Sequence, residues 1–165
     1  MFGLFKSSFS ANQLAGGLVR EVLPEVQSAL QKICTEADIA TGENYQSEES
    51  ALVFYMGMHA ILSRQWKPVI QRKVTVAYME CFFSSNNLDD SSEFYDQRMD
   101  EYTERLSEEK GKLPMNGVVN HFLDSLGVEA NDQHALRLGL NFLLLKQITA
   151  LAEWLNYVNS KFKIE

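Results

Sequence analysis

The sequence predicts an all-α fold, a single-domain bundle of five to six helices with a long C-terminal core helix. Apolar residues recur at spacings of three and four along several long stretches, which is typical of amphipathic helices. No run alternates apolar and polar residues between hairpin turns, as strands would. The length of 165 residues fits one domain. We therefore expect a single α-helical domain over 1–165, which begins with an apolar prefix at 1–9.

The first helix is predicted from a capping signal. Ser10 and Gln13 have the spacing of a capping box, and Phe9 and Leu14 stand where a hydrophobic staple places its two apolar residues. The apolar positions that follow are Leu14, Leu18, Val22, Val26, Leu30, Ile33 and Ala37. This helix is expected to end near residue 41, where a glycine follows.

A second helical region runs from Ser47 to about residue 83. Ser47 is followed by Glu48 and Glu49, and acidic residues in a first turn interact favourably with the helix dipole. Apolar residues cover a wide arc of this region, so we expect it to lie at the centre of the bundle. The polar run at 84–87 predicts its end.

Two prolines lie inside otherwise helical patterns. Pro24 interrupts the first helix and Pro68 the second region. Proline removes a backbone hydrogen bond and clashes with the preceding turn, so each is expected either to kink its helix or to split it in two. The sequence leaves both alternatives open.

Residues 89–109 are strongly acidic. They hold nine carboxylates and two arginines, a local charge of −7 that equals the net charge of the whole chain. The carboxylates are Asp89, Asp90, Glu93, Asp96, Asp100, Glu101, Glu104, Glu108 and Glu109. The other 144 residues hold 13 acidic and 13 basic side chains. One acidic element is therefore expected on a domain that is otherwise neutral.

This acidic element has the pattern of a surface helix. Its apolar residues are spaced 4, 3 and 4 apart, a seam about two positions wide per heptad: Tyr95, Met99, Tyr102 and Leu106. Asp90 and Glu93 are expected to open the helix, and Gly111 and Pro114 to end it.

Two helices are predicted after it. A short one covers roughly 117–126 and ends at Gly127, a plausible position for a left-handed cap. The last one is expected to start at Asn131 and Asp132 and to run for about 30 residues, which is about 45 Å of helix. We expect it to be the spine against which the others pack.

Composition argues against several functions. A net charge of −7 and a pI near 5.0 disfavour a nucleic-acid binder, which needs a basic stripe, and binding to anionic lipid by charge alone. The prefix carries only Lys6 and no long apolar run, so neither a signal peptide nor stable membrane anchoring is predicted. The best candidate span, 135–158, is interrupted by polar and charged residues. We expect a soluble protein.

The two cysteines, Cys34 and Cys81, form no C-x-x-C pair and lie in apolar helical patterns. A small secreted domain usually has paired cysteines, so we expect buried free thiols in a reducing, cytoplasmic setting.

No catalytic or metal-binding pattern is present in the sequence. His59, His121 and His134 fall in different predicted helices, without the spacing of a metal motif. His59 is expected in the core and His134 at the surface. Glu80 stands within an apolar helix but shares its face with polar residues, so we expect it to be exposed. The chain is predicted to have no enzymatic activity and no cofactor. An enzyme that uses carboxylates, with Glu80 as the candidate residue, remains a third hypothesis, which two or more buried acids in one cleft would favour.

The leading hypothesis is an adaptor, regulator or inhibitor that acts by binding another protein. One docking surface is predicted on the acidic helix and one on a basic cluster at a helix kink, where Arg and Trp are typical of interface hot spots. The candidate residues are Tyr95, Asp96, Asp100, Glu101, Tyr102 and Glu104, with Arg64, Trp66, Lys67, Arg72 and Lys73. Three alternatives remain open: solvated faces, a small-anion site at the basic cluster, and pairing of the two surfaces within one chain or in a homodimer.

The alternative hypothesis is a carrier or sensor of a small apolar ligand, bound in a pocket between helices. Eight apolar residues are candidates for its lining: Phe54, Met56, Met58, Met79, Phe82, Phe83, Phe142 and Trp154. Such residues at helical spacing are more often plain core. A cavity above about 300 Å³ would favour the ligand hypothesis.

Overall fold

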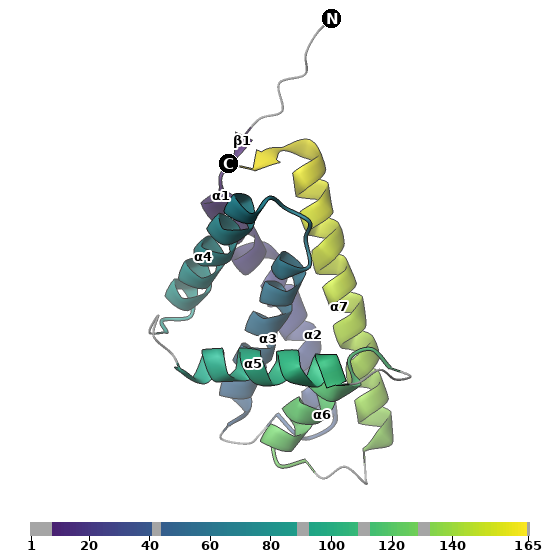
Figure 1. The fold of residues 1–165 in the computed structure, drawn as a ribbon. Helices are drawn as coiled ribbons and strands as arrows, with labels where there is room; N and C mark the ends of the chain where they lie inside the picture. Colours follow the sequence, from purple (N-terminus) through teal and green to yellow (C-terminus); the bar gives the residue numbers. More distant parts are fainter. Residues whose placement is uncertain (1–7, 41–43, 89–92, 109–112, 129–132, 165) are drawn as a thin grey trace, which may run out of the picture.

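The structure, a computed structural model of residues 1–165, describes residues 8–40, 44–88, 93–108, 113–128 and 133–164. These residues form the predicted all-α bundle (Figure 1). Its helices are α1 (Ala11–Gly17), η1 (Leu18–Val22), α2 (Leu23–Glu36), α3 (Tyr45–Leu62), α4 (Pro68–Ser85), α5 (Glu93–Glu108), α6 (Asn116–Ser125) and α7 (His134–Lys161). Because α1, η1 and α2 follow one another without a break, the described residues form six helical rods.

The first rod begins with the predicted capping box. The Gln13 side chain accepts a hydrogen bond from the Ser10 backbone (2.9 Å), and the Ser10 hydroxyl accepts one from the Gln13 backbone (3.1 Å). Pro24 lies in the first turn of α2, directly after the wider π-helical turns of η1. The helix therefore continues through Pro24, and the π turns are where its hydrogen-bond pattern shifts.

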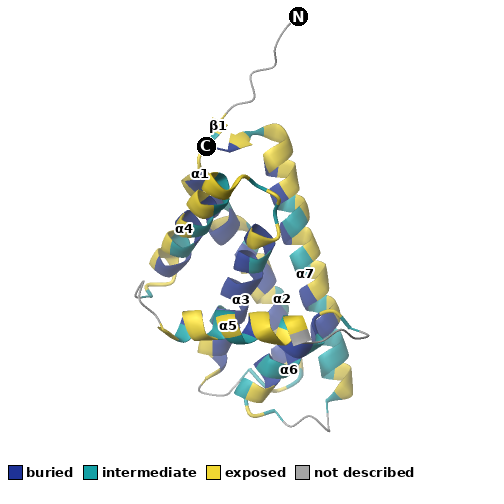
Figure 2. Cartoon of the chain, viewed as in Figure 1, coloured by how far each residue is buried: buried dark blue, intermediate teal, exposed yellow. Residues whose placement is uncertain are grey.

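The most buried element is α3, in which 13 of 18 residues are buried (Figure 2). It begins at Tyr45, so the expected start at Ser47 was wrong; no side-chain cap forms at Asn44. Pro68, in contrast to Pro24, splits its helical region. It opens α4, and the start of a helix tolerates proline because the first N–H groups have no partner within the helix.

α3 and α4 approach each other closely at a glycine. The Tyr78 hydroxyl of α4 donates a hydrogen bond to the backbone oxygen of Phe54 (3.0 Å), and Tyr78 is fully buried. A Cβ atom placed on Gly57 would lie 2.2 Å from the Tyr78 hydroxyl oxygen. The absence of a side chain at Gly57 thus sets the distance between the two helices.

The long C-terminal helix α7 lies along one flank, against α2, α3 and α6 (Figure 1). Only six of its 28 residues are buried, so α3 rather than α7 is the centre of the bundle. By length and composition alone α7 would also suit a membrane span, with a mean hydropathy of 1.3 in its most apolar window. The core helix of a soluble protein meets the same criterion.

A short strand pair joins the two ends of the described chain, which the sequence pattern did not predict. Strand β1 (Ser8–Phe9) pairs in parallel with β2 (Lys163–Ile164), and the rings of Phe9 and Phe162 lie 5.0 Å apart. Gly127, directly after the α6 cap, has the predicted left-handed conformation (φ 72°). Other predicted boundaries lie outside the described residues: 41–42, Asp90, Gly111 and 131–132, as do prefix residues 1–7.

The glycine at the α3–α4 contact gives a first testable prediction. Gly57→Ala should lower the free energy of unfolding by about 1–3 kcal/mol, because the added methyl group meets the Tyr78 ring. Gly139 in α7 is the matched control, since a Cβ there would have no atom within 4 Å. Gly139→Ala should raise stability by up to about 1 kcal/mol through helix propensity. Urea unfolding measures both, and equal effects would contradict the close contact.

Candidate functional site

The acidic helix α5 is attached to the bundle through two buried tyrosines. Tyr102 is fully buried and its ring lies 5.1 Å from that of Tyr55. Tyr95 is also buried, with its ring 5.6 Å from Phe54 and its hydroxyl 3.0 Å from the Ser50 hydroxyl oxygen. The prediction that these two tyrosines lie on an exposed docking face was wrong, because both are buried. They occupy the narrow apolar seam, which is the side that α5 packs inward.

An ion pair between α5 and α3 strengthens this attachment. Arg98 donates through Nε to Oε2 of Glu48 (2.9 Å) and through Nη2 to Oε1 (2.5 Å), so the contact is bidentate. Glu48 is only 4% exposed. Hydrogen bonds to Glu48, and to Glu101, raise the pKa of Arg98 despite its partial burial. Arg98 therefore stays charged, and its bidentate contact with Glu48 fixes the orientation of α5.

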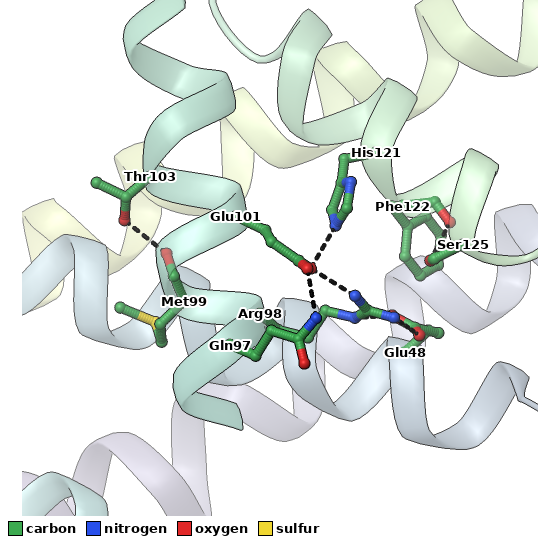
Figure 3. A network of polar contacts seen from close by, with 9 residues as sticks. All are labelled: Glu48, Gln97, Arg98, Met99, Glu101, Thr103, His121, Phe122 and Ser125. Carbon is green, nitrogen blue, oxygen red and sulfur yellow. Dashed lines mark hydrogen bonds and ion pairs between the residues drawn. The ribbon is translucent and has the colours of Figure 1, made fainter. Parts of the chain in front are cut away.

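Glu101 extends this network to α6 (Figure 3). Its carboxylate lies 2.9 Å from Nε2 of His121, accepts a hydrogen bond from Gln97 (2.7 Å), and pairs with Arg98. Partial burial alone would raise the pKa of Glu101, but these hydrogen bonds hold it below its usual value. Glu101, predicted as a docking residue, is thus engaged in contacts within the chain.

Four other carboxylates of α5 face solvent. Glu93, Asp96, Asp100 and Glu104 are spaced 3, 4 and 4 residues apart, and all four are exposed. This spacing places them along one face of a helix; we call them the acidic stripe. None of the four forms a side-chain hydrogen bond or ion pair with another described residue. The stripe is therefore a line of four uncompensated negative charges on a fixed helix.

Comparison of the chain with known protein families, with curated proteins and with solved structures gave no match. The chemistry of the site follows from its geometry alone.

In the predicted basic surface, one cation forms hydrogen bonds within the chain and three cations are exposed. Nη1 of Arg64 donates to Oδ1 of Asn156 (2.6 Å) and to the backbone oxygen of Ala152 (3.3 Å), so Arg64 ties the end of α3 to α7. Trp66 is half-buried. The exposed cations are Lys67, Arg72 and Lys73, which we call the basic group.

The basic group and the acidic stripe do not meet within one chain. The connection from α3 to α4 lies at the end of the bundle nearest the strand pair, and α5 crosses the opposite end (Figure 1). Pairing of the two surfaces inside one molecule, one of the alternatives left open, is thus excluded by the fold. Pairing between two copies stays a prediction.

The other candidate residues lie largely as expected. His134 and Glu80 are exposed; His59 is half-buried beside Tyr55, and burial lowers its pKa. Cys34 is buried, but Cys81 is only half-buried, so the expectation of two buried thiols was wrong for Cys81. Among the described residues no three His, Cys, Asp or Glu side chains are grouped to hold a metal ion.

The eight residues proposed to line an apolar pocket are distributed between core and surface. Five are buried, Met79 and Trp154 are half-buried, and Phe142 is 61% exposed. Phe82 borders a cavity of about 230 Å³, and Met79 and Phe83 border one of about 200 Å³. Both volumes are below the roughly 300 Å³ at which ligand pockets begin. The geometry thus favours core packing for most of the set.

Sequence reasoning missed the network of Glu48, Arg98 and His121. Glu48 was interpreted only as a first-turn acid with a favourable helix dipole. A signal was nevertheless present, because Arg98 is three residues from Tyr95 and four from Tyr102 and therefore lies on the apolar face of its helix. A cation on an inward face requires an acidic partner in the core.

The Arg98–Glu48 pair gives a second prediction. Arg98→Gln should lower the free energy of unfolding by about 2 kcal/mol, because it leaves the buried Glu48 carboxylate without its cation. The double variant Arg98→Gln/Glu48→Gln should recover part of that loss, since neither charge then remains buried alone. Arg72→Gln, at an exposed cation, is the control and should change stability by less than about 0.5 kcal/mol. Additive losses in the double variant would contradict direct pairing.

Proposed function

We propose that this chain is a non-enzymatic, cytoplasmic protein that acts by binding another protein, and that the acidic stripe of α5 is the docking surface. The partner surface it fits is basic. The observation that carries this proposal is the contrast within α5. Tyr95, Tyr102, Arg98 and Glu101 are used for attachment, whereas Glu93, Asp96, Asp100 and Glu104 face solvent unpaired.

Rigid attachment is what makes the stripe suitable for recognition. A helix that is already ordered does not lose conformational freedom when a partner binds, so less of the binding free energy is spent on ordering it. A row of like charges speeds association with an oppositely charged surface and discriminates against acidic competitors. The stripe is therefore suited to fast, selective and salt-sensitive binding.

A second copy of the chain is one partner of the required chemistry. The basic group of Lys67, Arg72 and Lys73 is exposed and lies at the other end of the bundle from α5. Two copies placed side by side in opposite directions would bring each acidic stripe near a basic group, as a two-fold interface requires.

Site-specific photo-crosslinking in living cells that make the protein tests this proposal. A photo-reactive residue at Gln97, exposed beside the stripe, should form an adduct with a basic protein or with a second copy. Neutralising the stripe with Asp96→Asn/Asp100→Asn/Glu104→Gln should reduce the adduct at least about fivefold, because the attraction is electrostatic. All three side chains are exposed, so the melting temperature should stay unchanged.

The matched control removes the same number of charges elsewhere. Glu21→Gln/Glu25→Gln/Glu36→Gln changes three exposed acids of the first rod and should leave the adduct intact. If the adduct is the chain itself, Lys67→Gln/Arg72→Gln/Lys73→Gln should remove it as well. An adduct that is insensitive to the stripe variant, or the absence of any adduct, would contradict the proposal.

A further inference from the structure

Two neighbouring glutamates at the start of α3 are buried to the same extent, but only one of them has a cationic partner among the described residues. Glu48 and Glu49 are each 4% exposed. Glu48 faces α5 and is paired with Arg98. Glu49 faces α2 and has no Lys, Arg or His partner among the described residues. Burial of a carboxylate without a cation is costly, so the environment of Glu49 calls for a specific explanation.

The partners of Glu49 are neutral donors that satisfy only part of its capacity. Its Oε1 accepts a hydrogen bond from the Tyr45 hydroxyl (3.0 Å), and its Oε2 accepts one from Nε2 of Gln27 (3.2 Å). A carboxylate can accept about four hydrogen bonds, so two positions remain for further donors.

Glu49 lines a polar pocket of about 450 Å³. Among the described residues, the walls come from α2, α3, the segment directly after α4, and Tyr95 of α5. They carry amide and hydroxyl groups, including those of Gln31, Gln46, Ser47 and Asn86. A smaller cavity of about 230 Å³ shares Gln27, Ser50 and Asn86 with it. The volume is within the range of small-molecule sites.

The charge of this pocket decides which ligands suit it. Among the described residues that line it, none is Lys, Arg or His, and Glu49 is the one charged side chain. Burial raises the pKa of the nearby Cys34 thiol to about 11 and also raises that of Tyr45, so both groups stay neutral. An anionic ligand would meet no positive side chain among the described lining residues. A cationic ligand would supply the positive counter-charge that is missing beside the Glu49 carboxylate.

We propose that the pocket beside Glu49 binds a small organic cation that carries a primary ammonium group. The ammonium donates to the open positions of the Glu49 carboxylate, and the surrounding amides and hydroxyls bind the rest of the ligand. Three N–H donors on one ammonium suit a carboxylate flanked by neutral acceptors. A metal ion fits less well, because the described lining residues hold no second carboxylate and no cysteine or histidine side chain. This proposal is independent of the docking function of α5.

Calorimetric titration of the full chain with butane-1,4-diamine tests it, with butane-1,4-diol as the neutral probe of matched length. The diamine should bind, and the diol should bind at least about tenfold more weakly, since a charge-assisted hydrogen bond is lost. Glu49→Gln should weaken diamine binding about tenfold or more, and the exposed Glu36→Gln should not change it. Gln31→Trp fills the pocket, leaves the charge of Glu49 in place, and should also abolish binding.

A ligand-free measurement separates a binding role from a structural one. Without any probe, Glu49→Gln should melt at the same temperature as the unmodified chain or higher, because it removes a buried uncompensated charge. Glu48→Gln, which breaks the pair with Arg98, should melt lower. The proposal is overturned if the diamine does not bind, if the diol or calcium chloride binds as well as the diamine, or if Glu49→Gln leaves diamine binding unchanged.

Discussion

The burial of α3 on all sides is the constraint on which the rest of this structure depends. A helix with 13 of 18 residues buried exposes little of its surface to solvent, and α2, α4, α5, α6 and α7 all pack against it. Its first turn carries two carboxylates, Glu48 and Glu49, which this burial removes from water together with the apolar residues. Each carboxylate must then find hydrogen-bond donors within the protein, since an unsatisfied buried charge is strongly destabilising.

Glu48 and Glu49 have different hydrogen-bond partners, and each arrangement underlies one of the two proposed sites. Arg98 neutralises Glu48 and in doing so fixes the rotation of α5 about its own axis. That rotation turns the seam of Tyr95 and Tyr102 inward and the acidic stripe outward. Glu49 receives only neutral donors and faces a polar pocket. The same burial thus creates a fixed acidic surface on one side of α3 and a negatively charged pocket on the other.

Sequence reasoning succeeded where the signal is local. The capping box at Ser10 and Gln13 and the left-handed position of Gly127 depend only on nearby backbone groups, and the structure confirms both. The helical class and the long C-terminal helix were predicted from the spacing of apolar residues, because that spacing follows the face of each helix that packs inward.

It failed where tertiary contacts decide the outcome. Tyr95 and Tyr102 were placed on a docking face although their own spacing marks the inward seam. Glu48 was explained by the helix dipole, a local effect of well under the cost of burying a charge, and its real partner stands 50 positions further along the chain. The described lining of the pocket beside Glu49 comes from α2, α3, α5 and the segment after α4, so no pattern within a single helix predicts it.

Native-state hydrogen exchange, measured residue by residue with NMR, tests most directly whether α5 is fixed to α3. If Tyr102 and the Arg98–Glu48 pair hold α5 in place, its amides at 98–102 should exchange only through the same rare opening that exposes those at 52–58 of α3. Exchange of the α5 amides that is orders of magnitude faster, while α3 stays protected, would show that α5 detaches from an intact bundle. The acidic stripe would then not be a preformed surface.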